Sequence, residues 1–195
     1  MTGTLPAMRI SAEEFLALDL EAHALLADVP LRDVSAIDLP DGGEARTVAD
    51  VLLRMESARA HPPLAVRVLV GLRRSIGRLF GWDGESVEPS FASRLSDDQR
   101  RRSLCRPGTR SGPLRLLYQF PNEVVGEARN ATVHAFSCMA LRVQPSGYRL
   151  YWAIYVESIS AFTPIYMTLI EPFRRFVVYP AILREIRASW VQPAR

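Results

Sequence analysis

The chain of 195 residues contains no lysine, so all 24 of its basic side chains are arginines. Alanine, arginine, proline, glycine and valine are abundant together, which indicates a G+C-rich coding sequence behind the arginine usage. Arginines outnumber acids in residues 61–120, whereas acids dominate residues 1–60. Because coding bias accounts for the arginines and the net charge is only +3, we expect no nucleic-acid partner.

Cysteine is also scarce. Cys105 and Cys138 are the two present, and neither has neighbours at the spacing of metal ligands. This usage indicates a reducing compartment and predicts neither a disulfide framework nor a metal site. No run of about 20 apolar residues could span a membrane, and the stretch from Met1 to Ile10 lacks the apolar core of a signal peptide. We therefore expect a cytoplasmic protein.

The common motifs of catalysis and cofactor binding are missing as well. The chain has no glycine-rich phosphate loop, no His-Glu-x-x-His, no Cys-x-x-Cys and no Gly-x-Ser-x-Gly. Its three histidines fall in different predicted elements. We expect no cofactor, and a binding protein in preference to an enzyme.

Helical patterns occupy the first part of the chain. Ser11-Ala12-Glu13-Glu14 is a capping box that predicts a short helix, and we expect residues 1–30 to form an N-terminal helical extension. Thr47 can cap the first member of a helical pair, with apolar residues at positions 48, 51, 52 and 55. The second member, residues 64–80, has an apolar stripe opposite several arginines.

Residues 83–113 lose periodicity and gain serine, proline, glycine and charge, which predicts a long basic loop. One short helix is expected inside it, capped by Ser96 and running to about Leu104. Its arginines lack the interleaved aromatic side chains on which single-stranded nucleic acids stack. We expect this loop to be solvated.

Beyond the loop the hydrophobic period changes from 3.6 to 2, which predicts a meander of antiparallel strands. If Ala128 pairs with Ala131 and Val143 with Tyr148, one face of the sheet becomes almost wholly apolar. The other face is mixed, and we expect it to meet water. The predicted strands are Leu114–Phe120, Glu123–Ala128, Ala131–Val143 and Tyr148–Glu157.

The last predicted element is a helix that begins at Thr163-Pro164 and crosses the apolar face. Pro172 and Pro180 each remove a backbone donor, so we expect a kink or break at both. These patterns together predict an α+β fold.

The stretch Ile165–Phe176 carries Tyr-Met followed by Glu-Pro-Phe-Arg-Arg, and it resembles the C-terminal signature of the bacterial domain-of-unknown-function family 2867. The resemblance implies a helix-grip architecture, as in the START lipid-transfer and polyketide-cyclase-like superfamily. There a curved antiparallel sheet wraps a long C-terminal helix and leaves an apolar cavity. On this reading residues 31–195 form one domain. The resemblance implies no established activity, although fusions to dehydrogenase-like domains hint at small-molecule metabolism.

The apolar face supplies the candidate ligand site. Ser137 offers a polar group, and Met139 pairs with Trp152 to give an adaptable wall that Ile154 extends. Tyr166 and Arg174 would contribute from the C-terminal helix, with Arg174 pairing an anionic head group. We expect a small apolar or amphipathic ligand between sheet and helix.

Two alternatives remain open from the sequence. A cyclase-like or dehydratase-like enzyme would use His134, Tyr155 or Tyr166 as acid or base. His134 lies opposite Glu157 in the predicted register, but on the mixed face, directed away from the pocket. Alternatively, the arginine-rich helix and loop would contact an anionic membrane surface or serve a structural role.

Overall fold

The computed structural model describes residues 8–41, 43–60, 90–129, 133–159, 168, 171–172 and 174–190, without the side chains of residues 8–9, 57–60 and 174. These residues form a seven-stranded antiparallel sheet in the order β1-β2-β7-β6-β5-β4-β3. The strands are β1 (Met8–Arg9), β2 (Leu31–Pro40), β3 (Thr109–Ser111), β4 (Leu114–Gln119), β5 (Glu123–Arg129), β6 (Val133–Gln144) and β7 (Gly147–Ser158). The helices are α1 (Ala12–Leu16), α2 (Glu21–Leu25), α3 (Val48–Ala60), the 3₁₀ turn η1 (Phe91–Arg94), α5 (Asp97–Arg102), the π-helical turn η2 (Arg174–Val178) and α7 (Tyr179–Trp190).

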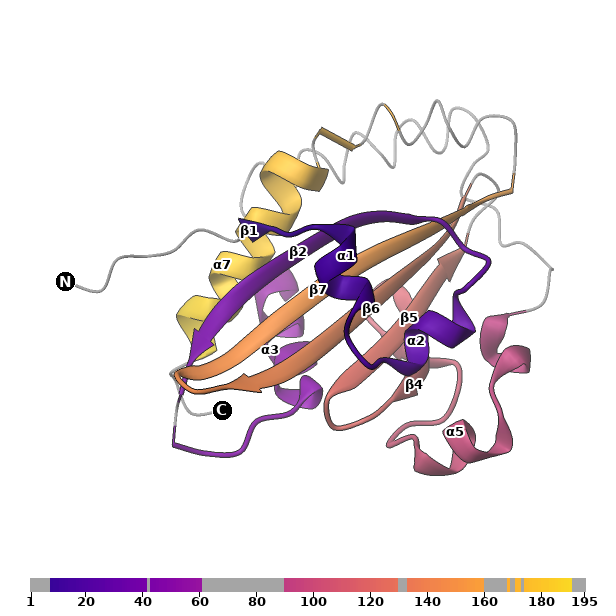
Figure 1. Ribbon diagram of the computed structural model, residues 1–195, viewed down its shortest axis with the longest axis horizontal. Coiled ribbons are helices and arrows are strands. Elements are labelled where there is room, and N and C mark those ends of the chain that lie inside the picture. Colours follow the sequence, from indigo (N-terminus) through magenta and orange to yellow (C-terminus); the bar gives the residue numbers. More distant parts are fainter. Residues whose placement is uncertain are drawn as a thin grey trace.

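Helices cover both faces of the curved sheet (Figure 1). The short helices α1 and α2 lie on the face toward the viewer, here called the front face, and α3 and α7 lie on the back face. The α+β fold with a C-terminal helix packed on the sheet is therefore confirmed, and it is consistent with a helix grip. None of the helices described is long and apolar enough to cross a membrane.

The hairpin between β6 and β7 has the predicted register. Val143 pairs with Tyr148, and the same ladder places Met139 opposite Trp152 and His134 opposite Glu157. The connection Pro145-Ser146-Gly147 supplies the turn chemistry, since Gly147 adopts a φ of 134° that side chains disfavour.

Replacement of Gly147 by alanine is expected to destabilise the protein by at least about 1–3 kcal/mol, because strained backbone adds to a steric overlap. A Cβ atom there would lie 2.4 Å from the carbonyl oxygen of Leu39 and 2.5 Å from the amide of Asp41. Gly108→Ala is the matched control, since Gly108 has a φ of 90° but open space around its Cα. Thermal unfolding should show the larger loss for Gly147→Ala, and equal losses would contradict the steric argument.

The predicted pairing of β5 with β6 is wrong by four residues. Ala128 pairs with Ala135, and His134 lies opposite Arg129. The Arg129-Asn130 step carries no strong turn signal, so the sequence did not fix the loop length. Because the shift is an even number of residues, every side chain still points to the predicted face.

The expected alternation of β4 is also interrupted. The β4–β5 pairing shifts between Leu116 and Tyr118, so these two side chains, predicted to share a face, lie on opposite faces. Leu116 joins the back-face core, whereas Leu117 and Tyr118 join the front-face core. A β-bulge of this kind inserts one residue and reverses the alternation beyond it.

The prediction that the mixed front face meets water is wrong. Phe15, Leu25 and Leu26 from α1, α2 and the following turn, together with Phe91 from η1, bury it. The polar groups on this face form hydrogen bonds with the elements that cover it. Glu123, for example, accepts the backbone N–H groups of Glu21 (3.1 Å) and Ala22 (2.8 Å) at the start of α2 and the Tyr118 hydroxyl.

Several of the predicted helix ends are confirmed. Ser11 accepts the N–H of Glu14, and Ser96 forms a reciprocal capping box with Gln99 at the start of α5. The predicted helix at residues 64–80 and the predicted start at Thr163 lie outside the described residues.

The C-terminal helix changes geometry where proline predicted a break. Pro180 has no N–H to complete the preceding turn, and residues 174–178 form a π-helical turn before α7 continues regularly. Leu183, Ile186 and Trp190 are fully buried against the back face.

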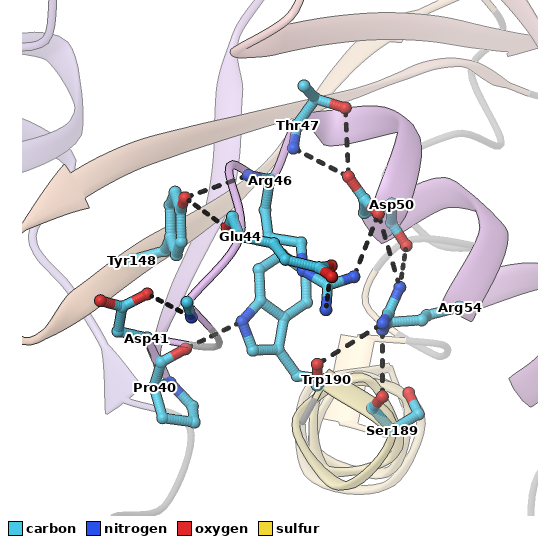
Figure 2. Close-up of polar contacts among 11 residues, drawn as sticks. Pro40, Asp41, Glu44, Arg46, Thr47, Asp50, Arg54, Tyr148, Ser189 and Trp190 are labelled. Carbon is cyan, nitrogen blue, oxygen red and sulfur yellow. Dashed lines mark hydrogen bonds and ion pairs between the residues drawn. The ribbon is translucent and has the colours of Figure 1, made fainter. Parts of the chain in front are cut away.

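A polar network joins the end of α7 to the start of α3 (Figure 2). The Arg54 guanidinium donates to the carbonyl oxygens of Ser189 (3.1 Å) and Trp190 (3.5 Å), so it caps the C-terminus of α7. Asp50 lies between Arg46 and Arg54, and both guanidinium groups lie within 6 Å of the Trp190 ring. The indole N–H of Trp190 donates to the carbonyl of Pro40 at 3.0 Å.

Candidate functional site

The side chains on the half of the back face beneath α7 are buried in one hydrophobic cluster. Met139 and Trp152, both predicted to form the wall of a pocket, are buried there. The Trp152 ring packs against Tyr179, the first residue of α7, with 4.8 Å between ring centroids. Tyr179, Leu183 and Ile186 of α7 belong to the same buried cluster of described side chains as Met139 and Trp152.

The back face carries a second group of buried side chains. Val133 and Val156 form a separate buried cluster farther along the same face. Ile154, which packs against both clusters, is itself only partly buried, and so is the neighbouring Ala135. Ile154 therefore lies between these two groups of described side chains.

Ser137 lies in the same cross-strand row as Ile154, directly opposite it. Its hydroxyl oxygen accepts the indole N–H of Trp152 at 2.8 Å. This hydrogen bond gives the polar atom of each side chain a partner on a buried face. A hydroxyl that accepts in this way still carries its own O–H donor. The Ser137 hydroxyl, predicted to be the polar group of a ligand site, is thus held in position by Trp152.

Asp33 occupies the same row on the other side of Ile154, and sequence reasoning did not identify it. Its side chain is on the back face, and the residue is only 7% exposed. Asp33 faces the back by the ordinary alternation of β2, since its neighbour Val34 faces the front. The shift in the β2–β7 pairing lies between Leu31 and Asp33, at the exposed Arg32. The row Asp33, Ile154, Ser137 thus sets two polar groups on either side of an apolar one, about 10 Å apart across two strand spacings.

The front face holds a second polar cluster, centred on His134. This imidazole is fully buried, with Nε2 at 3.0 Å from Glu127 and Nδ1 at 3.0 Å from Glu157. Glu127 also accepts the Ser90 hydroxyl and the Phe91 N–H. Burial raises the pKa of Glu127, but the hydrogen bonds from these three donors outweigh it and hold the pKa below its ordinary value.

The hydrogen bonds determine which nitrogen of His134 carries a proton. An ionised Glu127 can only accept, so Nε2 must donate to it. Nδ1 then has two possible partners. It donates to Glu157 when protonated, or accepts from Arg129, whose guanidinium lies 3.2 Å away, when not. The cluster is chemically that of an oriented base, but Phe91 covers it edge-on with 5.1 Å between ring centroids.

The other predicted residues do not complete either site. Tyr155 lies on the front face with its hydroxyl 3.5 Å from Nδ1 of His23, and burial raises its pKa well above the ordinary value. Arg174 lies in η2, but its side chain, like the whole of Tyr166, is outside the described residues. His134 and Tyr155 therefore face away from Ser137 and Ile154, as the predicted register required for His134.

No three histidine, cysteine, aspartate or glutamate side chains among the described residues gather as ligands for a metal ion. Cys105 and Cys138 are both free thiols, and burial raises the pKa of each. Neither thiol is therefore activated by its surroundings.

Comparison with known proteins assigns the chain to a family. Residues 25–181 match the model of a family described as protein of unknown function (DUF2867). The chain belongs to this family. The DUF2867 match runs from the end of α2 into α7, so it includes Asp33, Ser137 and Ile154 as well as Glu127 and His134. No curated protein matches the chain.

Proposed function

We propose that this DUF2867 protein binds a small apolar or amphipathic molecule on the back face of the sheet, beside the start of α7. The observation that carries the proposal is the row Asp33, Ile154, Ser137 on this face, whose middle side chain is only partly buried. A partly exposed isoleucine with a buried polar group on each side has the composition of a ligand pocket, which is mostly apolar with a few placed polar groups.

Two further features support this location. The π-helical turn η2 immediately precedes Tyr179, which packs against Trp152 on this face, and π turns are frequent at functional sites. The arrangement of sheet and C-terminal helix is consistent with a helix grip. The sequence resemblance implies a START-like fold, in which ligands occupy the space between sheet and C-terminal helix. The part of that space beneath α7 is filled by Tyr179, Leu183 and Ile186, so the ligand belongs at the N-terminal end of α7.

A filling substitution tests the proposal. The neutral probe N-phenyl-1-naphthylamine should bind the purified protein saturably, and Ile154→Trp should weaken that binding roughly tenfold or more, because the larger ring occupies the site. Val143→Trp is the control on the same face, since Val143 is 82% exposed near the end of β6. Probe fluorescence at matched protein concentration measures both affinities.

Equal binding by Ile154→Trp and the unaltered protein would place the probe elsewhere and contradict the proposal. Native mass spectrometry of freshly purified protein provides an independent measurement. A copurifying molecule that is present in the unaltered protein and Val143→Trp, and absent in Ile154→Trp, would identify the ligand directly.

A further inference from the structure

We infer that the ligand is an apolar carbonyl compound whose oxygen accepts a hydrogen bond from the Ser137 hydroxyl group. This inference rests on the proposed function and specifies the chemistry of the same site. Ser137 is 6% exposed and lies on the back face between Gly126 of β5 and Ile154 of β7. A polar group in such a place is costly unless its hydrogen-bonding capacity is used.

The hydroxyl proton of Ser137 is the first reason for the inference. A serine hydroxyl has one donor and two acceptor sites. Among the residues that the structure describes, the one hydrogen bond of this hydroxyl is that in which its oxygen accepts the indole N–H of Trp152 at 2.8 Å. An indole nitrogen only donates, so this bond does not use the hydroxyl proton. The proton is therefore available to an acceptor on the ligand.

The direction of the indole is the second reason. Trp152 approaches the Ser137 oxygen from the neighbouring row of the sheet, in which it pairs with Met139. The opposite neighbour of Ser137 on this face of β6 is Ala135. An accepted N–H and the hydroxyl's own proton take different directions around the oxygen. Donation away from the indole therefore points the O–H toward the side of Ala135.

The space on that side is bordered by small and apolar side chains. Ala135 and its cross-strand partner Ala128 are both partly exposed, and so is Leu114 at the start of β4. Leu114 leans over Gly126, since a Cβ atom added to that glycine would lie 3.1 Å from the Cβ atom of Leu114. Ile154 borders the same space on the β7 side. None of these side chains carries a polar atom, so the body of the ligand is apolar.

A carbonyl group suits this site better than a hydroxyl or an amino group. A carbonyl oxygen accepts without bringing a donor of its own. A ligand hydroxyl or amine that accepted from Ser137 would bury a further donor, and the bordering side chains of Ala135, Leu114 and Ile154 have no acceptor for it. A buried donor without a partner costs more than a neutral hydrogen bond contributes. The site thus selects ketones, quinones and esters over alcohols and amines of the same shape.

Benzophenone and diphenylmethane test the inference, because they share two phenyl rings and differ in a carbonyl against a methylene group. Equilibrium dialysis measures the affinity of each. Ser137→Ala should weaken benzophenone binding about three- to tenfold, the contribution of one neutral hydrogen bond, and change diphenylmethane binding by less than about twofold. Trp152→Phe is the matched control, since it breaks the same internal hydrogen bond but keeps the Ser137 hydroxyl. It should change the binding of both compounds by the same factor.

The infrared carbonyl stretch of bound benzophenone provides a measurement that needs no variant. In the unaltered protein its frequency should lie below that in hexane, because an accepted hydrogen bond weakens the C=O bond. Bound benzophenone with a stretch at the hexane frequency would overturn the inference and leave the proposed function standing. Equal effects on the two compounds in a folded Ser137→Ala protein would overturn it as well. If neither compound nor N-phenyl-1-naphthylamine bound saturably, the proposed function itself would be wrong.

Discussion

Replacement of Trp190 by alanine is expected to cost about 3–5 kcal/mol of unfolding free energy, the usual range for removing a fully buried aromatic side chain. Trp190 has no exposed surface, and its indole N–H is bonded to the Pro40 carbonyl. Its ring also lies against the guanidinium groups of Arg46 and Arg54. The substitution leaves a cavity and removes the aromatic surface on which two buried cations rest.

Urea denaturation followed by circular dichroism measures this loss, with Phe176→Ala as the matched control. Phe176 belongs to the same C-terminal helix but is 69% exposed, so its removal should cost less than about 1 kcal/mol. If Trp190→Ala unfolded at the same urea concentration as Phe176→Ala, the packing of α7 against α3 and β2 would not contribute to stability as the contacts indicate.

The second large effect is expected from Glu127→Ala, at about 3–5 kcal/mol, because each buried donor left without an acceptor costs about 1–3 kcal/mol. The substitution leaves three donors on the front face without their acceptor: His134, the Ser90 hydroxyl and the Phe91 N–H. Glu157→Ala removes the other carboxylate from the same imidazole. Because the Glu157 side chain is 38% exposed, this control should cost less than about 1 kcal/mol.

Hydrogen exchange distinguishes a local from a global effect of Glu127→Ala. Residues 90–99 should lose protection first, because Glu127 fastens η1 to the sheet. Equal stability of the Glu127→Ala and Glu157→Ala proteins would show that the buried carboxylate has no special role.

The same carboxyl predicts a pH dependence. The pKa of Glu127 is lower in the folded protein than in the unfolded chain, so its ionised carboxylate stabilises the fold. This contribution to stability is complete at a pH above the pKa of the unfolded chain, and it is lost as the pH falls through the pKa of the folded protein. Burial raises the pKa of Glu123, whose contribution has the opposite sign: it is present at low pH and lost as the pH rises. The difference between unaltered protein and Glu127→Gln isolates Glu127, and it should shrink on acidification below about pH 4.5, the ordinary range of a glutamate.

Local signals in the sequence were enough to predict the central hairpin. A glycine turn and strict alternation fixed the β6–β7 register, including the pairing of Met139 with Trp152. The β5–β6 loop had no comparable signal, and the predicted register slipped by four residues. The side chains of β5 and β6 were nevertheless assigned to the correct faces of the sheet, because side chains alternate with a period of two and the error is an even number of residues.

What the sequence failed to predict depends on contacts between distant segments. Strand β2 is covered on both sides, so the stretch Leu31–Pro40 shows no alternation to identify it. Without β2 there was no neighbour for β7, and Asp33 could not be placed beside Ile154. The front face was misassigned for a similar reason, since α2 and η1, which both help to bury this face, lie far apart along the chain.

The position of β2 in the sheet has a consequence for how the chain is made. Asp38 and Arg149, which face each other across β2 and β7, are 111 residues apart. On the ribosome β2 is synthesised early, but the edge that faces β7 cannot pair until β7 has emerged, so closure of the sheet is a late event dominated by non-local contacts. Until then β2 presents an unpaired edge of 10 residues to other chains. Synthesis of this domain is therefore expected to depend on protection of the nascent chain.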